Sequence, residues 1–191
     1  MMAETSAVRP CGHRYLHLDP VVQRLARLLA LVALCGLAGL RFNFTGSLPV
    51  GLYRVTRGVP SRGGLVLVCL PVSVAAFAMR RGYVQRGGPC ASGLVPVGKR
   101  IYALPGDTVT VTVAGLVVNR TLLPNSESLD LDHVGRRLPR LNPGRYPVGT
   151  GTLWVLSPYS PFSFDSRYFG PIEISAIQTG VRPLWTRSGP R

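Results

Sequence analysis

The sequence divides at Thr45-Gly46-Ser47-Leu48-Pro49-Val50-Gly51-Leu52-Tyr53, a stretch that directly follows its one long apolar run. Glycine and proline on either side of Ser47 predict a turn, because both residues favour backbone conformations that end regular structure. The apolar run before it predicts a membrane segment or an export signal. The stretch therefore places a serine in a turn where the chain would leave a bilayer.

The apolar run extends from Val21 to Leu40, and its uninterrupted part, Leu28–Leu40, has 13 residues. A complete span needs about 20 residues, but the long side chains of Arg24 and Arg27 can carry their charges to the membrane surface. The alternative is a cleavable signal peptide with a basic start and a short apolar centre. We expect an uncleaved anchor.

Arginines precede this run, which favours a cytoplasmic N-terminus, because basic flanking residues tend to stay on that side. The expected organisation is a polar cytoplasmic tail at 1–20, a membrane anchor at 21–42 and a β-rich domain at 43–191. This organisation describes a single-pass membrane protein whose folded domain lies outside the cytoplasm.

Composition and charge restrict the classes of partner. Hydrophobic residues make up 46% of the chain, which is enough for a core, and the net charge of +14 favours nucleic acid or an anionic lipid surface. The basic residues are scattered, however, and no nucleic-acid-binding motif accompanies them. The charge therefore favours an anionic membrane surface over nucleic acid, or is an arginine-biased composition without a function.

The cysteines and histidines predict no metal site, and we expect no cofactor. The four cysteines show none of the spacings of metal-binding motifs. Two of them, Cys69 and Cys90, could pair in an oxidising compartment, and the sequence leaves that pairing open. The histidines are dispersed, because His13 and His17 fall in the N-terminal tail and His133 falls in a polar loop.

The chain after the anchor predicts a mainly β fold, a compact β-domain with one short helix. Thr108–Val113 alternates threonine and valine, and a turn leads from it into Leu116–Asn119, which predicts a hairpin. Ser73–Gly82 predicts the helix, with Ser73 as its N-cap. Further strands are expected at Leu65–Leu70, Lys99–Ala103, Gly151–Ser157 and Pro171–Gly180, and a loop excursion at 120–150.

Lys99 is the one lysine among the 22 basic residues. A serine hydroxyl needs a base to become a nucleophile, and a neutral lysine amine can serve. An exposed lysine stays protonated, so a basic lysine must be buried, and the apolar neighbours Val97 and Ile101 predict burial. From spacing alone, Ser47 can also be a simple turn residue and Lys99 a surface lysine paired with a carboxylate.

Three stretches occur in the order of the signature boxes of a known family: Asn43–Tyr53, Lys99–Asp107 and Ser163–Pro171. Together they resemble the type I signal peptidase family. The SLPVGLY sequence that begins at Ser47 resembles the TraF-type branch, the conjugative-transfer signal peptidases. The resemblance covers roughly residues 40–186.

This resemblance implies a membrane-tethered serine endopeptidase on the outer face of the inner membrane. The implied substrate is an exported protein precursor, typically a conjugative pilin, that is cut after a small residue and in this branch can be cyclised. Ser47 would be the nucleophile and Lys99 the general base. Asp165 matches the acidic residue that the TraF-type branch adds to this dyad.

The same resemblance implies three supporting side chains. Thr45 would assist the Ser47 backbone N–H at the oxyanion hole, and Ser163 would orient the lysine amine. Arg167 would pair with Asp165 and hold the loop. Without the other two boxes, Asp165 and Arg167 would be an ordinary loop ion pair.

The chain also departs from the general family. Leu48 stands where typical signal peptidases carry methionine, and the short insert between the later boxes makes a large accessory β-domain unexpected, so a dedicated substrate is favoured. One alternative is a non-enzymatic inner-membrane component of a conjugation or secretion apparatus. Another is a LexA-like self-cleaving regulator, which the apolar run and the lack of a helix-turn-helix pattern oppose.

Overall fold

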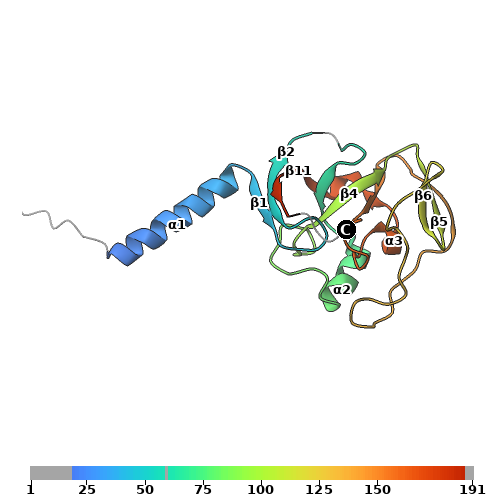
Figure 1. Cartoon of the computed structure of the whole chain (residues 1–191), viewed down its shortest axis with the longest axis horizontal. Coiled ribbons are helices and arrows are strands. Elements are labelled where there is room, and N and C mark those ends of the chain that lie inside the picture. Colours follow the sequence, from blue (N-terminus) through green and yellow to red (C-terminus); the bar gives the residue numbers. More distant parts are fainter. Residues whose placement is uncertain (1–18, 59, 188–191) are drawn as a thin grey trace, which may run out of the picture. The chain divides into compact units, whose positions relative to one another are not determined.

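The computed structural model describes residues 19–58 and 60–187 (Figure 1). The chain divides after Ala38 into two compact units, Met1–Ala38 and Gly39–Arg191. Most of the expected polar tail, with His13 and His17, lies outside the described residues.

The described part of the first unit forms one helix, α1 (Pro20–Leu37). Asp19 caps it, because its side-chain oxygen accepts the backbone N–H of Val21 at 2.7 Å, and proline at the first helical position suits the start. Its 18 residues have a mean hydropathy of 1.6, and none is buried. By length and composition, α1 can cross a membrane.

The second unit is built on two antiparallel sheets, which confirms the mainly β class. The larger sheet has the strand order β1-β2-β11-β3-β4-β9-β10, and the smaller has the order β7-β6-β5-β8. The strands of the larger sheet are β1 (Leu40–Asn43), β2 (Gly51–Thr56), β3 (Leu65–Val68), β4 (Val97–Ala103), β9 (Thr152–Leu156), β10 (Ile172–Glu173) and β11 (Ile177–Thr186). Those of the smaller sheet are β5 (Thr108–Thr112), β6 (Gly115–Val118), β7 (Thr121–Leu122) and β8 (Gly144–Pro147).

The predicted hairpin is confirmed, since β5 and β6 pair with Val111 opposite Leu116 (Figure 1). The loop predicted for 120–150 is only partly correct, because this segment also supplies β7 and β8 to the smaller sheet. The short Gly- and Pro-containing β8 has no alternating pattern of its own, and its pairing with β5 forms it. Trp154 of β9 is fully buried among apolar side chains of the smaller sheet and joins the two sheets through one core.

Two short helices follow α1 in the chain, α2 (Val72–Arg80) and α3 (Ser166–Phe169), and a 3-10 turn spans Ile174–Ala176. The prediction of Ser73 as N-cap is wrong, because α2 begins at Val72 with Pro71 as its cap and no side-chain capping bond. A proline has its φ already set for a helix start. The sequence did not predict α3, which begins inside the third box.

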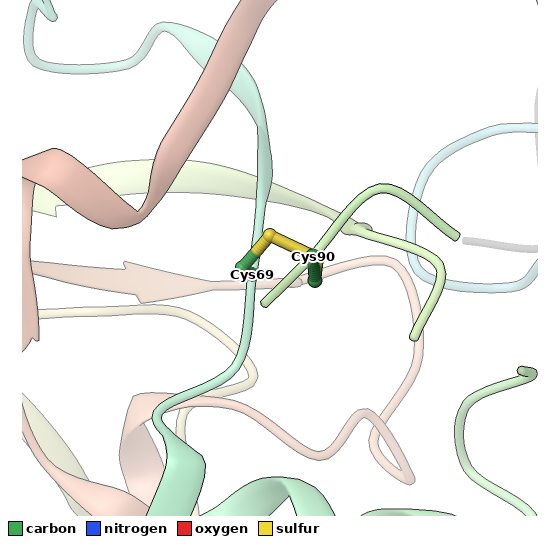
Figure 2. The surroundings of a disulfide bond; sticks show 2 residues. All are labelled: Cys69 and Cys90. Atoms are coloured by element: carbon green, nitrogen blue, oxygen red, sulfur yellow. A yellow bond between two sulfur atoms is a disulfide. The ribbon is translucent and has the colours of Figure 1, made fainter. Parts of the chain in front are cut away.

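Cys69, just after β3, and Cys90, in the loop between α2 and β4, form a disulfide (Figure 2). The sequence left this pairing open, because 21 residues separate the two cysteines and only the fold brings their Cα atoms to 5.6 Å. The bond ties the loop that leads into β4 to the end of β3.

Candidate active site

Lys99 lies in β4, between β3 and β9, near the middle of the larger sheet. Its side chain is 1% exposed, as its apolar neighbours predict. The Nζ atom donates a hydrogen bond to the Ser163 hydroxyl at 2.5 Å and lies 3.4 Å from the Ser47 hydroxyl oxygen. The fold thus brings one residue from each of the three boxes to a single point.

Burial lowers the pKa of the Lys99 amine to about 8, because an ammonium group loses hydration inside the protein. The negative charge of Asp165 acts in the opposite direction, and the positive charge of Arg167 lowers the pKa further. A lysine with this pKa is neutral in about a tenth of the molecules at pH 7, far more than an ordinary lysine. The neutral amine is the form that can accept a proton from a serine.

Ser47 lies in the turn between β1 and β2, and the side chain of Asn43 holds this turn from inside. Its amide nitrogen donates to the carbonyl oxygens of Thr45, Leu48 and Pro49 at 3.0, 2.9 and 3.3 Å. The Thr45 hydroxyl donates to Asn43 Oδ1 at 2.8 Å. Sequence reasoning did not single out Asn43, although it stands at the start of the first box.

The side chain of Leu48 packs this turn against β4. This side chain is 2% exposed and packs against Gly98, where an added Cβ would lie 2.6 Å from Leu48 Cδ1. Such an approach is possible only over a glycine, because real Cβ atoms are not found at this distance. The glycine before Lys99 therefore leaves the room in which the Leu48 side chain packs on β4.

For the precursor cleavage that the sequence resemblance implies, Gly98→Ala is expected to lower the rate by about 10- to 100-fold, because a displacement near 1 Å in an active site can have that effect. The new methyl group would push Leu48 away from β4 and move Ser47 with it. The measurement is kcat on a precursor peptide, together with a melting curve. Gly58→Ala is the matched control, since a Cβ there meets nothing within 4 Å, and equal rates for both variants would contradict the prediction.

Asp165 and Arg167 form a buried ion pair, with exposures of 0% and 1%. Arg167 donates from Nε to Asp165 Oδ1 at 2.8 Å and from Nη2 to Oδ2 at 2.9 Å. The backbone N–H of Ser157 donates to Oδ2 at 3.0 Å. Within the described ranges, no hydrogen bond or ion pair joins Asp165 to Lys99, so the member of the third box that touches the amine is Ser163.

A cavity of about 220 Å³ opens onto Ser47 and Lys99. Its other lining residues include Leu70, Tyr83 and His133. His133 lies in a loop, as the sequence predicts, and this loop reaches the cavity wall. Among the described residues, no three His, Cys, Asp or Glu side chains are grouped so that they could hold a metal ion.

The loop that carries His133 is held by its buried neighbour Asp132. The Asp132 carboxylate accepts the Tyr83 hydroxyl at 2.6 Å, Arg136 Nε at 2.8 Å and the backbone N–H of Val134 at 3.1 Å. Burial acts to raise the pKa of Asp132, but the hydrogen bonds from Tyr83 and Arg136 hold it well below its usual range. No local pattern could reveal this contact, because Tyr83 and Asp132 are 49 residues apart.

Comparison with known proteins gives matches over most of the chain. Residues 26–185 match the family model described as signal peptidase, peptidase S26. Plasmid transfer protein TraF of Escherichia coli is 42% identical over 159 residues, which cover 83% of this chain and 89% of that protein. Conjugal transfer protein TraF of Agrobacterium tumefaciens (strain 15955) is 36% identical over 160 residues, which cover 82% and 88%. A crystal structure of a signal peptidase I from Enterococcus faecalis V583 aligns at 20% identity with a TM-score of 0.36, covering 65% of this chain and 98% of that one.

Proposed function

Because the chain belongs to the signal peptidase S26 family, we propose that it is a membrane-anchored serine endopeptidase that removes a signal or propeptide segment from an exported precursor. The observation that carries the proposal is the approach of the buried Lys99 amine to within 3.4 Å of the Ser47 hydroxyl, beside an open cavity. The names of the relatives, which are plasmid and conjugal transfer proteins, favour a conjugative pilin as the precursor.

In the proposed reaction the neutral Lys99 amine accepts the proton of Ser47 Oγ while this oxygen attacks the scissile carbonyl. The Ser47 backbone N–H stabilises the oxyanion, and the Thr45 hydroxyl assists after turning from Asn43. Protonated Lys99, which Ser163 holds in place, then gives its proton to the departing amine. The acyl ester on Ser47 is released either by water, which yields a linear product, or by the precursor's own N-terminal amine, which yields a cyclic one.

The proposed organisation is a cytoplasmic tail at 1–20, an anchor at 21–42 and a periplasmic catalytic domain at 43–191. The length and composition of α1 support the anchor. The disulfide between Cys69 and Cys90 supports the periplasmic side, since disulfides persist in oxidising compartments.

Inner-membrane lipid is a proposed partner of the domain as well as of the anchor. Large apolar side chains stay exposed on β1, on the turn after it and on β11: Phe42 (48%), Phe44 (78%), Leu184 (47%) and Trp185 (62%). These strands share one end of the larger sheet, and arginines accompany them. Aromatic rings beside basic residues suit the interface of an anionic bilayer.

The test of the proposed function is co-expression with a candidate pilin precursor, followed by mass spectrometry of the pilin. Wild-type protein is expected to give a shortened product whose mass shows whether it is linear or cyclic. Ser47→Ala is expected to leave the precursor intact, because the nucleophile is absent, while Ser92→Ala, at an exposed serine, keeps cleavage. Processing by Ser47→Ala would refute the peptidase mechanism and favour a non-enzymatic component of the transfer apparatus.

A further inference from the structure

Ser157 is a buried polar residue beside the dyad to which the sequence assigned no role. It directly follows β9 and has 0% exposure. Leu156, the residue before it, pairs with Arg100 of the neighbouring antiparallel strand β4. Because antiparallel strands advance in opposite directions, Ser157 comes level with Lys99.

The hydroxyl of Ser157 donates a hydrogen bond of 2.5 Å to the backbone carbonyl of Ser47. Its backbone N–H donates to Asp165 Oδ2 at 3.0 Å. One buried residue thus contacts the nucleophile's own backbone with its side chain and the buried ion pair with its main chain.

Much of the turn around Ser47 is held by bonds from the nearby Asn43. Asn43 holds the carbonyl oxygens on either side of Ser47, at distances of two to six residues along the chain. The bond from Ser157 spans 110 residues. This bond therefore fixes the peptide group of Ser47 relative to β9, the strand that lies beside Lys99.

We propose that Ser157 is a positioning residue for the reaction of Ser47, a role that rests on the proposed function. Holding the Ser47 carbonyl fixes the peptide plane that follows the Cα atom, and with it the direction of the Cα–Cβ bond. The Ser47 hydroxyl is thereby kept within reach of the Lys99 amine. Ser157 is not itself among the residues that line the cavity, and its hydroxyl bonds the carbonyl of Ser47. It therefore acts on the geometry of the nucleophile and leaves the proton affinity of the base unchanged.

The same bonds give Asp165 an indirect part in catalysis. Arg167 fixes the carboxylate of Asp165, and that carboxylate fixes the backbone of Ser157. The ion pair thus contributes to the placement of Ser47 through Ser157 without contacting the reacting atoms.

The experiment compares Ser157→Ala with Ser166→Ala on a precursor peptide, measuring kcat, KM and the pH dependence of kcat. Ser166 is a matched control, because it is also fully buried and its hydroxyl accepts the backbone N–H of Val155 in the same strand. We expect Ser157→Ala to lower kcat by about 10- to 100-fold with KM and the pH midpoint unchanged. Ser166→Ala is expected to retain kcat within a few-fold of wild type.

An isosteric pair covers the case in which Ser157→Ala does not fold. Ser157→Thr and Ser157→Val have the same shape and differ in the hydroxyl, so the threonine variant is expected to be the faster by at least about tenfold. Equal rates within this pair, or a wild-type kcat for Ser157→Ala, would overturn the proposal, as would a pH midpoint that differs from that of the wild type. If wild type and Ser47→Ala do not differ, the proposed function itself has failed.

Discussion

Replacement of Lys99 by methionine is expected to abolish cleavage and, at pH 7, to raise the free energy of unfolding by about 3 kcal/mol. The pKa of Lys99 is about 8 in the folded chain and 10.5 for an ordinary lysine. Each pKa unit corresponds to about 1.4 kcal/mol, so protonated Lys99 opposes folding by this amount below pH 8. Methionine fills a similar space without a charge.

The sign of the pH dependence follows from proton binding. Between about pH 8 and pH 10.5 the unfolded chain holds a proton on Lys99 that the folded chain has lost, so the stability of the wild type rises with pH across this window. The advantage of Lys99→Met is therefore full at pH 7 and absent above about pH 10.5. Urea unfolding at both ends of the window measures it.

Lys99→Arg is the contrasting variant, because a guanidinium group cannot lose its proton. We expect it to be inactive and less stable than the wild type at every pH. The cleavage rate of the wild type should fall about tenfold per pH unit below pH 8, as the lysine becomes protonated. A rate that stays level down to pH 5, or a Lys99→Met variant no more stable than wild type at pH 7, would contradict this account.

Breaking the buried pair of Asp165 and Arg167 is expected to destabilise the domain by about 3–5 kcal/mol, because one charge would remain buried without its partner. Arg167→Met leaves the carboxylate unpaired, and Asp165→Asn leaves the guanidinium unpaired. The double variant should lose less than the sum of the single losses, since neither charge then remains. Chemical unfolding of all four proteins measures this coupling.

The two single variants should also shift the pH profile in opposite directions. The charge of Asp165 raises the pKa of Lys99, so Asp165→Asn lowers the midpoint of the acid limb. The charge of Arg167 lowers that pKa, so Arg167→Met raises the midpoint. An Asp165→Asn variant that keeps wild-type stability and loses far more activity than Ser157→Ala would instead show that Asp165 takes part in the chemistry directly.

Local sequence patterns were sufficient for several elements of the fold. The threonine–valine alternation and the Ala114-Gly115 turn predicted the hairpin, because strand period and turn chemistry are read over a few residues. Contacts between segments that lie far apart in this chain could not be predicted from such patterns. The strand β8 and the disulfide between Cys69 and Cys90 depend on partners far along the chain, and no local preference encodes them.

The sequence by itself determined that Ser47 follows an apolar segment in a turn and that Lys99, the one lysine, stands among apolar residues in a strand. Both features are properties of short stretches. The order of the three signature boxes then linked the two residues to one family of peptidases. Only the tertiary structure decided which atoms meet: Ser163 at the lysine amine, Ser157 at the carbonyl of Ser47, and the loop of His133 at the cavity wall. The physical reason is that burial and close contact between residues 50 to 110 positions apart arise from the packing of whole sheets, which no single stretch contains.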